Sequence, residues 1–259
     1  MSGERFDFTG AQGQRLAGRL ERPAGAPVGC ALLAHCFACG KDVFAATRLA
    51  AALTAHGVAV LRFDFTGLGA SEGEFGNGGF GANIEDLVAA ADAMRTAGIA
   101  PTLLIGHSLG GAAVLAAAGA VAEARAVITI GAPFEAPHVL GLFKDQLATI
   151  EADGAADVRL GGRAFKITRA FVDDVRRHDA TDHIGRLRKA LLVMHSPIDA
   201  VVGIENAARI FERARHPKSF VSLDDADHLL HRRSDAEYVA GVIAAWAVRY
   251  IGSGAGPGA

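Results

Sequence analysis

Residues Gly106-His107-Ser108-Leu109-Gly110 form a G-x-S-x-G pentapeptide. An apolar run at 102–105 precedes the pentapeptide and an apolar segment of helical length, 109–121, follows it. A serine between a strand and a helix sits on a sharp turn that lifts its hydroxyl above a sheet, where only small side chains fit two residues to either side. The pentapeptide therefore predicts that Ser108 is a nucleophile. A glycine-rich turn with an incidental serine is the alternative, and the flanking elements disfavour it.

Short buried strands alternate with longer helical segments on both sides of this turn. The expected strands lie at 30–36, 58–65, 102–107, 126–130, 190–195 and 218–223, after an opening hairpin made of 5–9 and 15–22. The expected helices lie at 41–56, 84–91, 109–121, 204–211 and 239–250, where apolar residues recur at helical spacing. Such alternation is typical of a mostly parallel sheet with helices on both faces. The sequence therefore predicts the α/β fold class.

One segment, at about 134–185, is too long for a simple connection between two strands. It contains helical apolar spacing at 139–150 and a hairpin signal at Gly161-Gly162. We expect it to be a small lid inserted over the carboxyl ends of the strands, where open α/β sheets bind ligands. The chain is thus predicted to be one domain at 1–251, followed at 252–259 by a glycine-rich tail with the composition of a flexible linker.

A serine nucleophile needs a base, and the base needs a third group that fixes its tautomer. Where such a turn presents a serine nucleophile, its partners follow in the chain order serine, then an acid, then histidine. Asp199 follows the strand at 190–195, and His228 follows the strand at 218–223. Parallel strands end at one edge of the sheet, so both side chains are expected on the same edge as Ser108. We predict that Asp199 orients His228 and that His228 is the general base.

Other residues compete for these roles. His231 is an alternative base, and Asp225 and Asp227 are alternative acids. Both aspartates lie on the same loop as His228. A carboxylate there is poorly placed to reach the side of the imidazole ring that points away from Ser108. His107 is expected to pack beside the nucleophile turn.

Acyl transfer also needs backbone N–H groups that stabilise the oxyanion of a tetrahedral intermediate. One donor is expected to be the amide of Leu109, directly after the nucleophile. The other should come from the loop after the strand at 30–36, and the amide of Phe37 is the candidate.

Cys36 and Cys39 form a C-x-x-C motif on that same loop, just before an expected helix. Three interpretations stay open: structural or incidental thiols, a redox-sensitive pair that controls the oxyanion loop, and a metal site. The metal site is the least favoured, because no second C-x-x-C or matched histidine pair accompanies the motif. We therefore expect no metal.

The composition excludes several classes of protein. The chain has 259 residues, of which 51% are hydrophobic and 21% charged, with a net charge of −2. This balance favours a large buried core and gives no reason to expect binding to nucleic acid or to a membrane surface. We find no signal-peptide pattern and no apolar run long enough to span a membrane. Three cysteines do not suggest a secreted disulfide framework, so the cytoplasm is the expected location.

Taken together, these residues resemble the α/β-hydrolase family over essentially the whole chain. More narrowly, the chain resembles the hydrolase half of bacterial proteins in which a hydrolase is fused to an OsmC-type, peroxiredoxin-like domain. The matching stretches are His35-Cys36-Phe37-Ala38-Cys39-Gly40-Lys41-Asp42, Leu61-Arg62-Phe63-Asp64-Phe65-Thr66-Gly67-Leu68-Gly69, Gly106-His107-Ser108-Leu109-Gly110-Gly111, His195-Ser196-Pro197-Ile198-Asp199 and Asp227-His228. Cys36 stands where most hydrolases have glycine.

The resemblance implies hydrolysis of small acyl esters by a serine carboxylesterase, without a cofactor, and with a lid that shapes the acyl pocket. It assigns catalysis to Ser108, Asp199 and His228, and the oxyanion hole to the amides of Phe37 and Leu109. An OsmC-like domain is the partner that it implies in fused relatives, although no such half follows in this sequence. The alternative function is a thiol-redox or oxidative-stress accessory protein that uses Cys36 and Cys39 on a hydrolase scaffold.

Overall fold

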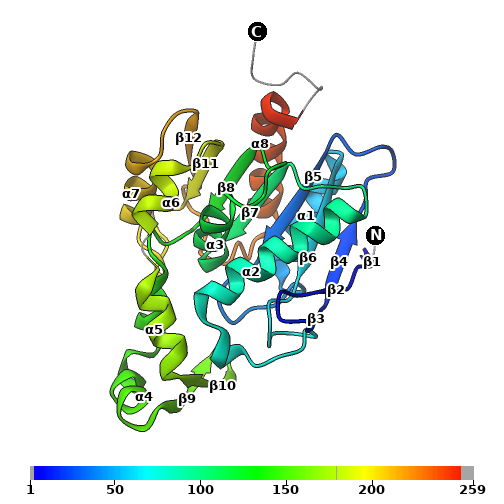
Figure 1. The fold of residues 1–259 in the computed structure, drawn as a ribbon. Helices are drawn as coiled ribbons and strands as arrows, with labels where there is room; N and C mark the ends of the chain where they lie inside the picture. The colour runs from blue at the N-terminus through cyan, green and yellow to red at the C-terminus, as the bar shows by residue number, and fades with distance from the viewer. Residues whose placement is uncertain (1–2, 179, 252–259) are drawn as a thin grey trace.

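A computed structural model of the chain describes residues 3–178 and 180–251. Its main sheet, as far as these residues show, has eight strands in the order β1-β4-β6-β5-β7-β8-β11-β12 (Figure 1). These strands are β1 (Glu4–Arg5), β4 (Gly18–Glu21), β6 (Val58–Phe63), β5 (Gly29–Ala34), β7 (Leu103–His107), β8 (Ala126–Ile130), β11 (Ala190–His195) and β12 (Lys218–Ser222). Neighbours are parallel from β6 to β12, whereas β4 pairs antiparallel with β6 and β1. The mostly parallel sheet that the sequence predicts is confirmed.

Both faces of the sheet are covered by helices, because the central strands carry apolar side chains on both sides. In β5, Ala31 and Leu33 belong to one buried cluster, and Leu32 and Ala34 belong to the other. The first cluster includes residues of helices α1 (Phe44–Ala55) and α8 (Arg233–Ile251). The second includes residues of α2 (Phe75–Thr96), α3 (Leu109–Ala117) and α7 (Glu205–Arg213). The core is therefore two apolar layers separated by one sheet.

The opening hairpin is also confirmed, with β2 (Phe8–Thr9) paired antiparallel to β3 (Arg15–Leu16). The expected strand at 30–36 ends earlier, at Ala34, and the expected helix at 41–56 begins later, at Phe44. The intervening residues turn back on themselves, because Cys39 N–H donates to the Cys36 carbonyl and Val43 N–H donates to that of Gly40, at 3.2 Å each. These turns lie at the carboxyl end of β5.

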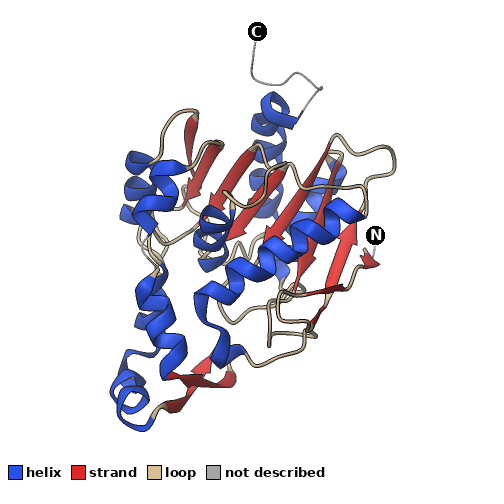
Figure 2. Cartoon of the chain, in the orientation of Figure 1, coloured by secondary structure: helices blue, strands red, loops and turns tan. Residues whose placement is uncertain are grey.

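The inserted segment between β8 and β11 has secondary structure of its own. It comprises η1 (Ala136–Gln146), α4 (Leu147–Asp153), β9 (Ala155–Leu160), β10 (Arg163–Thr168), α5 (Arg169–Arg177) and α6 (Ala180–Arg186). The hairpin predicted at Gly161-Gly162 is confirmed, with Leu160 opposite Arg163. In Figure 2 the arrowheads of the central strands point toward the side of the molecule on which β9, β10, α4 and α5 lie. The role of this insertion as a lid stays a prediction.

The segment 139–150, where the sequence shows helical apolar spacing, is divided between two helices. The structure has a 3₁₀ helix up to Gln146 and a separate short α-helix after it, and the backbone leaves helical geometry at Phe143, where φ is −142°. The Phe143 ring is buried in the core layer that contains α2 and α3.

No helix in the described part of the chain is long and apolar enough to cross a membrane. The glycine-rich tail that was predicted at 252–259 lies outside the described residues.

A buried carboxylate ties the end of β6 to the loop after β5. Asp64 accepts hydrogen bonds from the backbone N–H of Lys41 at 2.6 Å, from Lys41 Nζ at 3.0 Å and from the N–H of Ala70 at 3.0 Å. A Cβ at Gly69 would lie 2.3 Å from the carboxylate, so only glycine fits there. Asp64 therefore fixes the position of the loop that contains the predicted oxyanion donor.

We expect Asp64→Asn to lower the free energy of unfolding by about 3 kcal/mol, because it removes the buried charged partner of the Lys41 ammonium and leaves only an exposed one, Asp42. The side chain of Asp64 is 2% exposed, whereas that of Asp42, the other partner of Lys41, is 58% exposed. Asp42→Asn is the matched control, with an expected loss below about 1 kcal/mol. Urea denaturation of both variants measures the difference, and equal losses would contradict this account of the loop.

Candidate active site

Ser108 lies on a sharp turn between β7 and α3. Its φ of 56° and ψ of −128° are unusual for a residue other than glycine. A Cβ at Gly106 would lie 2.2 Å from the Gly110 carbonyl oxygen, and a Cβ at Gly110 would lie 2.5 Å from that of Ala34. The two glycines that the sequence singles out are thus required by close backbone contacts. They allow the turn to place the Ser108 hydroxyl above the carboxyl end of the sheet.

The structure brings Ser108, His228 and Asp199 together from three separate loops. Nε2 of His228 lies 3.0 Å from Oγ of Ser108, and Nδ1 of His228 lies 2.7 Å from Oδ2 of Asp199. An ionised carboxylate only accepts hydrogen bonds, so Nδ1 carries the hydrogen and Nε2 of the neutral ring is left to accept the serine proton. The side chains of His228 and Asp199 are both buried, which shields these contacts from water.

Backbone groups hold the other oxygen of Asp199. Its Oδ1 accepts hydrogen bonds from the N–H groups of Val201 and Val202, at 2.9 Å each. Burial alone would raise the pKa of Asp199, but the hydrogen bond with His228 and those from the two backbone amides outweigh it and lower the pKa. Asp199 is therefore stabilised as a carboxylate facing His228.

The competing residues have other partners. His231 has a side chain that is 63% exposed and pairs with Asp227 at 3.2 Å. Asp225 pairs with Arg232 at 2.7 Å on the surface. None of these contacts is with Ser108, so the structure favours His228 and Asp199 over the alternatives.

Phe37 and Leu109 lie on the two loops from which oxyanion donors were expected. Leu109 is the first residue of α3, and the first N–H groups of a helix have no partner within the helix. The Phe37 N–H has no acceptor among residues 3–178 and 180–251. Its ring packs against Phe75 and Phe171, with centroids 5.3 and 6.0 Å away. Phe37 is thus in contact with the insertion through its ring while its amide stays available.

Cys36 and Cys39 form a disulfide, with their Cα atoms 5.4 Å apart. The bond closes the turn that contains Phe37. Arg163, in β10 of the insertion, donates from Nη2 to the carbonyl oxygens of Ala38 at 2.5 Å and of Cys39 at 3.2 Å. Sequence analysis missed this contact, since a single arginine in a surface hairpin carries no motif. Within the described part of the chain, no group of three or more potential metal ligands occurs.

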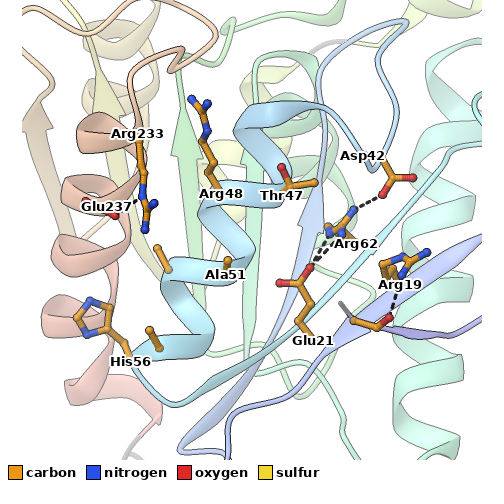
Figure 3. Close-up of a pocket in the computed structure, with 13 residues that line it drawn as sticks. Arg19, Glu21, Asp42, Thr47, Arg48, Ala51, His56, Arg62, Arg233 and Glu237 are labelled. Carbon is orange, nitrogen blue, oxygen red and sulfur yellow. Dashed lines mark hydrogen bonds and ion pairs between the residues drawn. The ribbon is translucent and has the colours of Figure 1, made fainter. Parts of the chain in front are cut away.

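A groove of about 970 Å³ lies elsewhere, between β4, α1 and α8 (Figure 3). It contains none of the predicted site residues. Its charged side chains pair within the protein, as Arg62 does with Glu21 at 3.0 Å and Arg233 with Glu237 at 2.7 Å. These pairs give the groove a structural role, and we assign it no ligand.

Comparisons with known proteins agree with this architecture. A family model described as the alpha/beta hydrolase family matches residues 31–242. The chain is similar to the crystal structure of the esterase domain of a Rhodothermus marinus protein, with 47% sequence identity and a TM-score of 0.79. The match covers 97% of this chain and 100% of that domain. A search of curated proteins finds no match.

More distant structures share the fold alone. Est1E from Butyrivibrio proteoclasticus is 18% identical, with a TM-score of 0.77 and coverage of 97% of this chain and 99% of that one. The alpha/beta hydrolase GrgF from Penicillium sp. sh18 is 17% identical, with a TM-score of 0.80 and the same coverage of both chains.

We expect Gly106→Ala to lower the free energy of unfolding by about 3 kcal/mol, because the new methyl group would overlap backbone atoms of the turn after Ser108. Gly119→Ala is the control, since a Cβ there meets no atom within 4 Å. Its stability should stay within about 0.5 kcal/mol of the wild type in urea denaturation. Wild-type stability of the Gly106 variant would show that the turn does not require glycine.

Proposed function

The chain belongs to the alpha/beta hydrolase family, and from this premise we propose that it is a serine-dependent carboxylesterase that cleaves small acyl esters through an acyl-enzyme intermediate. The similarity to an esterase domain at 47% identity supports ester hydrolysis as the reaction. Fold alone does not define a substrate, so the mechanism and the acyl group depend on the residues of the site.

One observation carries the proposal, namely the continuous series of hydrogen bonds from Ser108 through His228 to Asp199. Its two contacts of 3.0 and 2.7 Å lie within the range for a nucleophile activated by a base that a carboxylate orients. The order of these residues along the chain is the one expected for this fold.

In the first half of the proposed reaction, Oγ of Ser108 attacks the ester carbonyl carbon while Nε2 of His228 takes the hydroxyl proton. The carbonyl oxygen becomes an oxyanion that accepts hydrogen bonds from the amides of Phe37 and Leu109. Asp199 stabilises the imidazolium that forms and keeps its proton on Nδ1. Collapse of the intermediate breaks the bond to the leaving alcohol, which takes the proton from Nε2.

In the second half, a water molecule attacks the acyl carbon and His228 takes its proton in the same way. The second tetrahedral intermediate releases the carboxylic acid and returns the proton to Ser108. All groups in this scheme are side chains, backbone amides and water, so the proposed reaction requires no cofactor.

The packing around Phe37 supports a small acyl group. An ester whose carbonyl oxygen meets the Phe37 amide would direct its acyl chain toward the ring of Phe37, which is packed against Phe75 and Phe171. Three residues of the insertion, Leu140, Phe143 and Phe171, are buried in the apolar core and are therefore engaged in packing. The insertion would then limit acyl length, in keeping with the predicted lid role.

The thiol-redox alternative rests on the placement of Cys36 and Cys39 beside the proposed active site and on the resemblance to OsmC fusions. None of the comparisons supports that function, and we do not propose it for the chain. A redox influence of the pair on the oxyanion loop, and a relationship to OsmC fusions, stay predictions of the sequence.

We expect Ser108→Ala to reduce kcat for p-nitrophenyl butyrate by about 10⁴-fold or more, because single substitutions in such a site remove the covalent pathway. The measurement is the initial rate of p-nitrophenol release by purified protein. Ser219→Ala, on the edge strand β12, is the control and should keep wild-type activity. Cleavage that survives in the Ser108 variant would refute the proposed mechanism.

A series of p-nitrophenyl esters tests the acyl group. The wild type should prefer acetate and butyrate to octanoate in kcat/KM, and Phe171→Leu should raise the octanoate-to-butyrate ratio by about tenfold, since one or two methylenes of pocket space change such ratios by that order. Phe80→Leu is the control, because the Phe80 ring is buried against His178 and not against Phe37. A ratio that stays unchanged in the Phe171 variant would exclude this ring from the acyl site.

A further inference from the structure

Two histidines that take no part in the proposed proton transfer lie next to His228 and Asp199. His107 is the last residue of β7, and His195 is the last residue of β11. Their exposed fractions are 5% and 0%. Buried histidines at the carboxyl ends of two strands are placed to contact the loops that leave neighbouring strands at the same edge.

His107 contacts the loop of the base. Its Nε2 lies 2.6 Å from the backbone carbonyl oxygen of His228. A carbonyl only accepts, so Nε2 of His107 carries the hydrogen and donates it. The bond joins positions 121 residues apart in the chain. It holds the main chain of His228 at the residue whose side chain reaches Ser108.

His195 contacts the loop of the acid in the same manner. Its Nε2 lies 2.7 Å from the carbonyl oxygen of Val202, and the N–H of Val202 donates in turn to Oδ1 of Asp199 at 2.9 Å. The distance from Nε2 of His195 to Oδ2 of Asp199 is 3.7 Å, too long for a hydrogen bond. His195 therefore acts on the acid through the backbone of its loop.

We propose that His107 and His195 are positioning residues of the esterase site, which fix the base loop and the acid loop by donating from Nε2 to the backbone carbonyl oxygens of His228 and Val202. The inference rests on the proposed function and goes beyond it, since it assigns roles to two side chains outside the hydrogen-bonded series of three.

Electrostatics explains why histidine, and not a permanently charged residue, suits positions 107 and 195. The rings of His107 and His228 lie 5.1 Å apart, so a permanent cation at position 107 would oppose the positive charge that His228 gains during the reaction. Burial, and then the nearby His228, lower the pKa of His107 to about 4, which keeps it a neutral donor at neutral pH. A lysine or arginine at position 195 would compete with His228 for the carboxylate of Asp199.

An unsatisfied buried nitrogen of His195 also supports a positioning role. Nδ1 of His195 is buried and has no hydrogen-bond partner among the described residues. An unpartnered buried acceptor destabilises the fold, and a leucine there would avoid the penalty. The hydrogen bond from Nε2 of His195 to the Val202 carbonyl compensates for this penalty.

Glutamine and asparagine variants test the inference, because both are polar but only glutamine carries an amide N–H at the reach of Nε2. We expect His107→Gln and His195→Gln to keep kcat for p-nitrophenyl butyrate within about threefold of the wild type. We expect the two asparagine variants to lose about 10- to 100-fold in kcat, with KM changed less than about twofold, since a displacement of about 1 Å costs that much. His56→Asn, at the exposed end of α1, is the control.

A second readout does not depend on hydrolysis. Proton NMR should show a low-field resonance for the Nδ1–H of His228 in the wild type and the glutamine variants, and a shifted or lost resonance in the asparagine variants. Equal kcat in the glutamine and asparagine variants, or an unchanged resonance in all of them, would overturn the inference. Failure of the wild type to cleave any ester would instead refute the proposed function and leave the resonance to decide the positioning roles.

Discussion

The hydrogen bond of 2.7 Å between His228 and Asp199 is the contact on which the account of this molecule depends. It joins two loops that leave different strands, and it decides which nitrogen of the imidazole faces Ser108. The parallel sheet makes the bond possible, because β7, β11 and β12 all end at the same edge. The strained turn at Ser108 then brings the hydroxyl to within 3.0 Å of the other nitrogen.

The loop after β5 is held from two directions. From within the sheet layer, Asp64 binds the backbone and the ammonium of Lys41, and from the insertion, Arg163 binds the carbonyls of Ala38 and Cys39. The disulfide closes the turn between these two attachments. The amide of Phe37 thus lies on a loop with little freedom, which is what preorganised stabilisation of an oxyanion requires.

Local sterics and strand order could be predicted from the sequence, and contacts between distant side chains could not. Gly106 and Gly110 reveal the nucleophile turn because they flank Ser108 in the sequence. The crowding that requires Gly106 comes from the nearby backbone of Gly110, whereas the crowding at Gly110 comes from the backbone of Ala34 in β5. Asp199 and His228 could be found because they follow predicted strands in the expected order. The role of His107 is invisible in the sequence, since its acceptor is a backbone atom 121 residues away, and Arg163 likewise contacts a loop 125 residues away. The apolar spacing at 139–150 likewise does not reveal the break in helical geometry at Phe143, whose ring is buried.

The most direct test of the central claim is mass spectrometry of the protein after reaction with a fluorophosphonate, which modifies only a serine activated by a neighbouring base. The account predicts one adduct per chain, mapped by peptide analysis to Ser108, and no adduct when His228 is replaced by alanine. An unmodified chain, or an adduct on another residue, would contradict the claim that Ser108, His228 and Asp199 act together.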